Sequence, residues 1–199
     1  MKKGKLVIFG YAPGAFREKS GKIDLGAMKE LTGISFDCAP GKITRLVTSK
    51  FGKFGTAVKY SPGFFVNDKT ANTLGTFANS KLTAVAGKKV NGANVVVTMV
   101  PEMTPDFYRN IFRKNGLHIF CESSDPVYYD GRFIAIHANT SGEKVLTLPE
   151  AREWYDLFRN KAASGKSKTL KLKMERGQTE IFFIGSKADA ERFRKTALY

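Results

Sequence analysis

Short apolar runs separated by glycine, proline and asparagine turns recur along most of this chain. The first run, at residues 6–9, is continuous, which is typical of a strand covered on both faces. It leads into a sharp Gly/Pro turn at residues 10–14. Five later runs are also predicted as strands, at residues 43–51, 53–60, 64–68, 82–90 and 93–101. Asn91-Gly92 is predicted to join the last two as a hairpin.

Helical spacing of apolar residues is clearest at residues 104–116. Thr104 is a good N-cap, Pro105 suits the first helical position, and Phe107 and Ile111 share one face. Three other helices are also predicted, at residues 24–33, 149–160 and 186–198. In the last of these, Ser186 and Asp189 form an approximate capping box.

The helix at residues 104–116 is followed at once by an apolar stretch at 117–122, predicted as a strand. A helix that feeds directly into a strand is typical of α/β folds. Antiparallel elements are expected afterwards: a hairpin at 125–138, a strand at 143–149 and a hairpin at 169–185. The basic stretch at 160–168 is the best linker candidate. We therefore expect an α/β domain at residues 1–160, with residues 161–199 packed on the same domain.

The composition indicates a packed interior. The chain has 199 residues, of which 42% are hydrophobic and 16 are Phe, enough for one domain with a proper core. No apolar run approaches the roughly 20 residues of a membrane span. Residues 1–16 superficially resemble a signal peptide, but Gly10, Pro13 and Gly14 break the run and favour a strand. The chain as written is expected to be cytoplasmic; one cut from a longer precursor would be secreted.

The formal net charge is +15. Such a protein attracts phosphate polymers and anionic surfaces. The lysines are spread along the chain, and no known nucleic-acid-binding motif accompanies them. Nucleic acid, acidic polysaccharide and a merely solvated lysine-rich surface therefore all remain open.

Residues 116–138 concentrate chemistry, since they hold both histidines, Cys121 and three acids. In a strand at 117–122, His118 and Cys121 would face opposite sides and could not form a nucleophile–base pair. His118 and Glu122 would lie roughly 13 Å apart, too far to bind one metal. Cys38 and Cys121 form no zinc pattern. We expect neither catalysis nor a metal or other cofactor here.

A ligand site is more plausible where residues 122–129 leave the strand, because ligands of α/β sheets bind at strand ends. Tyr128 and Tyr129 are suited to stacking on sugar or base faces, although they also fit a hairpin with one core-facing tyrosine. The ligand-contact candidates are Glu122, Asp125, Tyr128, Tyr129 and His137.

The order and spacing of several motifs resemble a known domain. They are "YAPG" after the first strand, "LTGI", "FFVND" with "ANTLG", "NGLHIF", "DPVYYDGRFIAIHA", "SGEKVLTLP" and "WYDLF". Together they resemble the glutamine-amidotransferase-like domain, named for β-galactosidase trimerisation, of family 42-like and agarase-like glycoside hydrolases. The resemblance covers residues 6–158, with 177–185 as a last hairpin.

The resemblance implies a flavodoxin-like, class I amidotransferase-like α/β sheet with added antiparallel hairpins. Such domains are usually non-catalytic and contribute to oligomer contacts or to the rim of a neighbouring subunit's sugar site. Ala12 occupies the position of the amidotransferase nucleophile, so the thiol is missing. The catalytic barrel of the glycosidases and its carboxylate pair are also missing at this length. The first βα units of the family are lacking as well, so we expect another copy of the chain to cover the edge at residues 6–9.

Three functions follow as hypotheses. The first is a non-catalytic accessory or oligomerisation domain of a carbohydrate-active protein, either as a homo-oligomer or within a larger parent glycosidase. The second is a basic protein that binds nucleic acid or another polyanion. The third is a hydrolase using Cys121 and His137.

Overall fold

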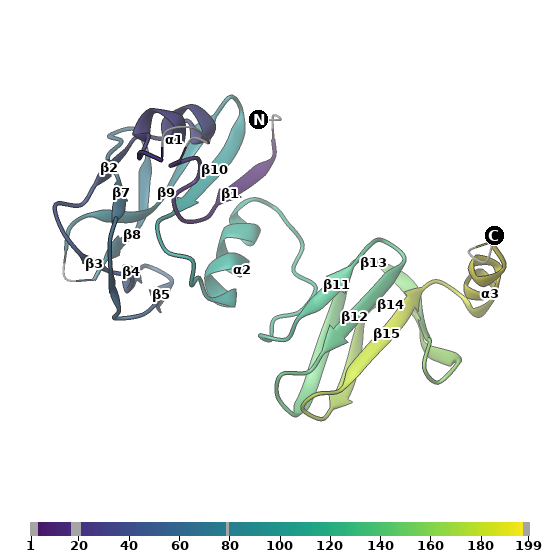
Figure 1. Ribbon diagram of the computed structural model, residues 1–199. Helices are drawn as coiled ribbons and strands as arrows, with labels where there is room; N and C mark the ends of the chain where they lie inside the picture. The colour runs from purple at the N-terminus through teal and green to yellow at the C-terminus, as the bar shows by residue number, and fades with distance from the viewer. Residues whose placement is uncertain (1–3, 17–20, 79, 197–199) are drawn as a thin grey trace. The chain divides into compact units, whose positions relative to one another are not determined.

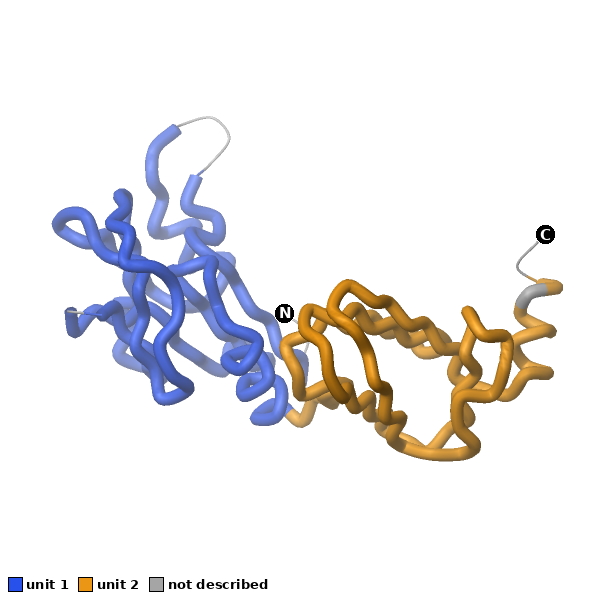
Figure 2. The backbone as a smooth tube through the Cα atoms, turned by 90° about the horizontal axis from the view of Figure 1, so that it is seen from below, with its two compact units in different colours: residues 1–115 blue, residues 116–199 orange. Residues whose placement is uncertain are grey.

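The chain forms two compact units, Met1–Asn115 (unit 1) and Gly116–Tyr199 (unit 2) (Figure 2). The computed structural model describes residues 4–16, 21–78 and 80–196, with the side chain of Arg194 excepted. The predicted boundary at residue 160 falls inside unit 2, in the turn between two paired strands. No helix in the described ranges is long and apolar enough to cross a membrane.

Unit 1 is built around one branched sheet (Figure 1). Its strands are β1 (Leu6–Phe9), β2 (Phe36–Cys38), β3 (Ile43–Thr44), β4 (Val47–Ser49), β5 (Gly52–Phe54), β6 (Lys59–Tyr60), β7 (Phe64–Val66), β8 (Asn72–Phe77), β9 (Thr83–Val90) and β10 (Ala93–Thr98). The sheet runs β1-β10-β9-β8-β4-β5, and β7 pairs with both β9 and β2. A separate ribbon joins β3 to β6. Among the described strands, β1 and β10 form the one parallel pair.

The local signals for unit 1 are largely confirmed. Asn91 and Gly92 both have positive φ, 50° and 80°, as a primed hairpin turn requires, and they join β9 to β10. Helix α1 (Leu25–Thr32) begins where the Asp24 carboxylate accepts a hydrogen bond from the Ala27 N–H. Helix α2 (Pro105–Lys114) begins in the same way at Thr104.

The core of unit 1 is rich in aromatic side chains. Phe64 and Phe77 from the sheet and Phe107 from α2 are almost completely buried. Phe54 packs on Phe107 with ring centroids 5.0 Å apart. The high phenylalanine content therefore does form a packed interior, because large rings bury much apolar surface per residue.

Unit 2 is an antiparallel sheet that curls on itself, followed by one helix (Figure 1). Its elements are β11 (Val127–Tyr129), β12 (Phe133–His137), β13 (Gly142–Asp156), β14 (Lys161–Met174), β15 (Thr179–Ile184) and α3 (Lys187–Thr196). The strand order is β11-β12-β15-β13-β14. Val127 of β11 packs against a core formed by side chains of the other four strands: Ile134, Ile136, Leu146, Leu148, Trp154, Leu170, Met174, Phe182 and Ile184. The sheet therefore closes as a half-barrel around Trp154.

The predicted α/β, flavodoxin-like fold is wrong. A parallel sheet needs helical crossovers between neighbouring strands, whereas the strands described here pair antiparallel except β1 with β10. Residues 117–122 are not a regular strand, and only Cys121 makes an isolated bridge, to Leu146. The α/β step predicted after α2 is thus missing.

Three further predictions in unit 2 are also wrong. The predicted helix at 149–160 is the second half of β13, because Trp154 and Tyr155 pair with Ile184 and Phe183 of β15. The predicted linker at 160–168 forms the start of β14. Because β13 lies between β14 and β15, residues 169–185 do not form a hairpin.

The hairpin at 125–138, the strand at 143–149 and the capping box of α3 are confirmed. In that box the Ser186 N–H donates to the Asp189 carboxylate, and the Asp189 N–H donates to the Ser186 hydroxyl. The predicted end of this helix at 197–198 lies outside the described residues.

Candidate functional site

Each of the two histidines forms a hydrogen bond with a threonine of a β-strand. The His118 ring N–H at Nε2 donates to the Thr147 carbonyl over 2.7 Å, and the ring lies edge-on to Phe120. His137 is exposed, and its Nδ1 lies 2.8 Å from the Thr179 hydroxyl. Cys121 instead meets the Ser123 hydroxyl, 3.0 Å from its sulfur. Among the described hydrogen bonds, none joins Cys121 to His137 as a nucleophile–base pair would require.

Asp125 is the centre of a buried ion pair. Its carboxylate lies 2.8 Å from the Lys144 ammonium, and both side chains are at least 96% buried. The Ser123 hydroxyl and the Asn139 N–H also donate to it. Burial alone would raise the pKa of Asp125, but these hydrogen bonds and the Lys144 charge outweigh it and hold the pKa below its usual range. The pair joins the loop before β11 to β13.

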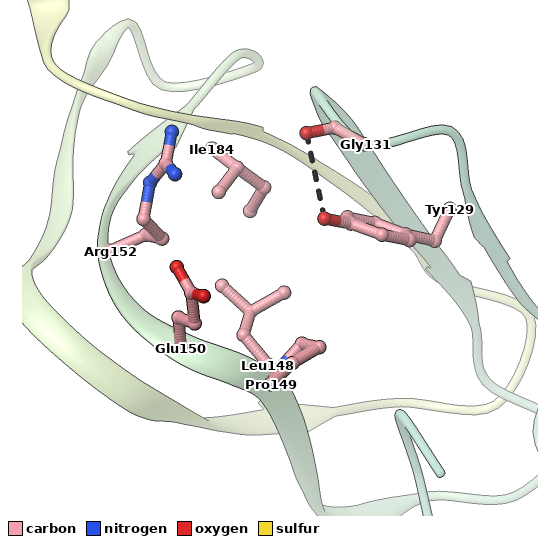
Figure 3. Close-up of a pocket in the computed structure, with 7 residues that line it drawn as sticks. All are labelled: Tyr129, Gly131, Leu148, Pro149, Glu150, Arg152 and Ile184. Atoms are coloured by element: carbon pink, nitrogen blue, oxygen red, sulfur yellow. Dashed lines mark hydrogen bonds between the residues drawn. The ribbon is translucent and has the colours of Figure 1, made fainter. Parts of the chain in front are cut away.

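The other predicted contact residues separate. Glu122 is exposed, and Tyr128 is 71% exposed on β11. Tyr129 packs against Phe120 with centroids 4.5 Å apart and lines a hollow of about 190 Å³ (Figure 3). Among the five predicted contact residues, Tyr129 alone lines the hollows described below.

The hollow beside Tyr129 exists because β13 bends. The pairing of β13 with β14 shifts register between Thr147 and Arg152, so the strand bows outward over residues 148–151. Leu148 and Ile184 form the apolar floor, while Glu150 and Arg152 of β13 lie across from Tyr129 (Figure 3). Bulges commonly re-aim side chains in this way.

Two larger hollows, about 410 Å³ each, adjoin the first and share Arg152 with it. We call the three together the Arg152 groove. Its charged and aromatic lining residues are Tyr129, Arg132, Glu150, Arg152, Glu153, Lys166, Phe183, Asp189, Arg192 and Phe193. All of them belong to unit 2.

The charged groups of the Arg152 groove differ in how far neighbouring residues already engage them. The Asp189 carboxylate caps α3, and hydrogen bonds from Ser186 together with the charges of Arg192 and Arg152 hold its pKa below the usual range. The guanidinium of Arg132 lies over the Phe193 ring, 5.4 Å from its centroid. Within the described ranges no ion pair is formed by Arg132, Arg152 or Arg192.

The predicted elbow position in unit 1 has the backbone of a strained turn without the chemistry. Ala12 follows β1 with φ of 52°, in the left-handed region. Its methyl group packs against the core of unit 1, and the neighbouring Tyr11 hydroxyl donates to the Pro62 carbonyl. A methyl side chain supplies no nucleophile.

No cluster of three or more metal-binding side chains occurs in the part of the chain that the structure describes. Sequence reasoning missed Glu150, Arg152 and Lys144. The first two lie within the helix predicted at residues 149–160, and their alternation with Ala151 and Glu153 does not produce the apolar face that would indicate a strand. Lys144 carried no signal, because nothing in its neighbours indicates burial.

Comparisons with known proteins give a likeness in fold. No protein-family model and no curated protein matches the sequence. Solved β-galactosidases do match in structure. That of Bacillus circulans has a TM-score of 0.53 at 12% identity, over 90% of this chain and 29% of its own. A family GH42 β-galactosidase of G. stearothermophilus has 0.53 at 14%, over 90% and 28%. That of Halorubrum lacusprofundi has 0.54 at 13%, over 92% and 27%.

At this identity the likeness shows the fold alone. The chain spans less than a third of the length of these β-galactosidases. Each match covers at least 90% of this chain, so it includes residues of both unit 1 and unit 2. The predicted relation to family 42-like glycoside hydrolases is thereby confirmed in its coarse form, as a likeness to part of such enzymes.

Proposed function

We propose that the chain is a non-catalytic accessory portion of a carbohydrate-active protein related to glycoside hydrolases, with the Arg152 groove as a saccharide contact. The main support is the structural likeness to a partial segment of GH42 β-galactosidases. The groove adds an exposed tyrosine ring beside a carboxylate and a guanidinium. Rings stack on sugar faces, and planar polar groups accept or donate to neighbouring hydroxyls.

Two measurements test this role. The chain alone is expected to leave a chromogenic β-galactoside unhydrolysed, at the rate of buffer; hydrolysis that Glu150→Gln abolishes would contradict it. In affinity electrophoresis through galactan, Tyr129→Ala is expected to lose retardation while Tyr128→Ala keeps it. The two tyrosines are neighbours on β11, but only Tyr129 lines the groove. Equal mobility of both variants in galactan and in blank gels would contradict the saccharide contact.

We also propose that unit 1 takes part in assembly, through β1. This strand ends the order of the described strands, so its outer edge has no strand partner there. Exposed edges readily add another strand. Light scattering is expected to give at least twice the 22.0 kDa of one chain. A folded monomer across the accessible concentrations would contradict this assembly.

Polyanion binding is a second candidate, which the distribution of charge favours. Unit 1 has 19 Lys and Arg against 7 Asp and Glu, a formal +12, whereas unit 2 has 14 against 11, or +3. Lys50 and Lys114 both lie over the Phe51 ring, 5.3 and 4.9 Å from its centroid. The neighbouring Lys50 lowers the pKa of Lys114, and a bound anion would relieve this repulsion.

The test is the salt dependence of binding to duplex DNA or heparin. Affinity is expected to fall steeply between about 50 and 200 mM salt. The double change Lys50→Gln and Lys114→Gln should weaken binding more than Lys171→Gln and Lys173→Gln, which remove the same charge from unit 2. Absence of binding at 50 mM salt, or equal effects of the two pairs, would contradict a polyanion site on unit 1.

A further inference from the structure

The geometry points to an acidic saccharide as the ligand of the Arg152 groove, one that carries a carboxylate or a sulfate ester beside a neutral sugar. That the ligand is a saccharide rests on the proposed carbohydrate role. That the ligand is negatively charged follows from how the lining groups are distributed along the groove.

The groove has two chemically different ends. At one end Tyr129 and Glu150 border the small hollow over an apolar floor. At the other end Arg132 and Arg192 border a larger hollow. Arg152 borders both, so it stands where the two ends meet.

At the end that Arg132 and Arg192 border, no ion pair of the described residues uses the N–H donors of the guanidinium groups. Each guanidinium offers five N–H donors in a planar fork that matches carboxylate and sulfate-like oxyanions. Asp189 faces Arg152 and Arg192, but its Oδ2 already accepts from the Ser186 N–H and hydroxyl. This single carboxylate therefore offsets only part of the positive charge of the three guanidinium groups.

The third hollow moderates this charge without removing it. Lys166 lies there with Glu150, Glu153 and Asp189, so the whole groove carries four cations and three carboxylates. Glu150 lies at the tyrosine end, where a carboxylate suits sugar hydroxyls and disfavours an anion. The acidic group of the ligand is thereby directed toward Arg132 and Arg192.

The tyrosine end sets the neutral part of the ligand. The Tyr129 ring is 40% exposed and is held in place by Phe120 behind it, so a sugar face can stack without ordering the ring first. The volume of about 190 Å³ at this end is of the order of one sugar ring. A short oligosaccharide with an acidic neighbour to that ring fits both ends.

The test measures binding, by calorimetry at one fixed ionic strength, of four probes: trigalacturonate, a sulfated galactan oligosaccharide, neutral galactotriose and sodium sulfate. At least one acidic oligosaccharide is expected to bind at least tenfold more tightly than galactotriose and than sulfate. Preference between the first two distinguishes a carboxylate from a sulfate ester. Arg152→Gln is expected to reduce the affinity for the acidic oligosaccharide about tenfold.

Arg176→Gln is the matched control. Arg176 is exposed in the turn before β15, at the end of this strand opposite to Ile184 and the groove, and it should leave the affinity unchanged. Equal losses in both variants would reduce the effect to general charge and overturn the inference. Galactotriose binding as tightly as the acidic probes, with Arg152→Gln silent, would overturn the acidic ligand yet keep the carbohydrate role. Failure of every saccharide to bind would overturn both.

Discussion

The two units differ in where their charges lie. In unit 1, with its formal +12, few acids balance the lysines, and the core is a cluster of aromatic and aliphatic side chains. In unit 2, with +3, charges are drawn into pairs: Lys144 with Asp125, and Arg159 with both Asp156 and Glu180. The excess of positive charge therefore makes the surface of unit 1 basic. In unit 2, positively charged side chains form pairs with acids and line one groove.

This contrast follows from the shape of each sheet. In unit 1, Met28 of α1 and Phe107 of α2 pack into the core of the sheet, and the largely buried carboxylate of Asp68 pairs with the more exposed Lys88. The half-barrel of unit 2 must join a short strand pair, β11 and β12, to the long β13 and β14 through loops. Buried Asp125 accepts from such a loop and from β13 at the same time, which fixes the loop at the cost of burying two charges.

The strongest test of the contrast removes the core of unit 2. Trp154→Ala deletes an indole that is fully buried and donates to the Ser167 carbonyl. We expect the free energy of unfolding of unit 2 to fall by about 4 kcal/mol. Hydrogen exchange by mass spectrometry should show faster exchange in residues 116–199 and unchanged exchange in unit 1. Phe158→Ala, at a ring that is 62% exposed, is the control, and equal loosening of unit 1 would mean that the units are not independent.

Lys144→Met tests the buried pair. It leaves the Asp125 carboxylate buried without its cation, so we expect a loss of about 3 kcal/mol in urea denaturation of unit 2. Lys171→Met serves as the control, because the Lys171–Glu143 pair is exposed on both sides and should matter by less than about 1 kcal/mol. Adding Asp125→Leu to Lys144→Met should recover part of the loss. Similar effects of the two lysine variants would show that burial does not set the value of the pair.

Acid should separate the units further. The pKa values of Asp125 and Asp156 are held below the usual range in the folded state, Asp156 by donors from Arg159 that outweigh its burial. A carboxyl group with a lowered folded pKa contributes stability above its unfolded pKa of about 3.9 and loses it as pH falls toward the folded pKa.

We therefore expect urea midpoints that are level from about pH 7 to 5 and fall below about pH 4. The fall should be larger for unit 2, because Asp130 and Asp189 also have lowered pKa values there. In unit 1, Asp68 behaves in the same way, since donors from Lys88 and Thr70 outweigh burial and lower its pKa. Exchange rates of the two units, compared at each pH, give the measurement. A larger acid loss in unit 1 would contradict the assignment of most ion-pair stabilisation to unit 2.

The smallest expected effect is on the stability of unit 1, through the loss of one helix cap. Thr104→Ala removes the hydroxyl that accepts from the Phe107 N–H at the start of α2 and should cost about 1 kcal/mol. The loss should be confined to unit 1 in hydrogen exchange. Thr56→Ala, at an exposed threonine outside any helix, is the control and should be near zero. A loss that spreads into unit 2 would again contradict independent units.

The predictions that succeeded rest on interactions within a few residues. The caps at Asp24 and Thr104, the Asn91-Gly92 turn and the Ser186 capping box each depend on backbone groups three or four positions away. Such groups are close in any fold, so the sequence reveals them. The hairpin at residues 125–138 belongs to the same class.

The predictions that failed depend on partners distant in the chain. Residues 149–156 have residue types that tolerate a helix, but pairing with β15 and burial of Trp154 make them a strand. Residues 117–122 look like a strand and lack a partner ladder beyond the one bridge at Cys121. The resemblance named the glycosidases to part of which this chain is similar in fold, but it implied the wrong fold class, because the order of motifs does not fix which strands pair.

The sequence by itself determined the local elements of unit 1, the phenylalanine-rich core and the excess of positive charge, since these follow from residue type and short-range spacing. Tertiary structure alone decided that β13 passes between β14 and β15, that Lys144 is buried against Asp125, and that Tyr129 meets Glu150 and Arg152 across a groove. The pairing of β13 with β15, the Lys144–Asp125 pair and the groove each join residues more than 15 positions apart, through strand pairing and burial that only the closed sheet creates.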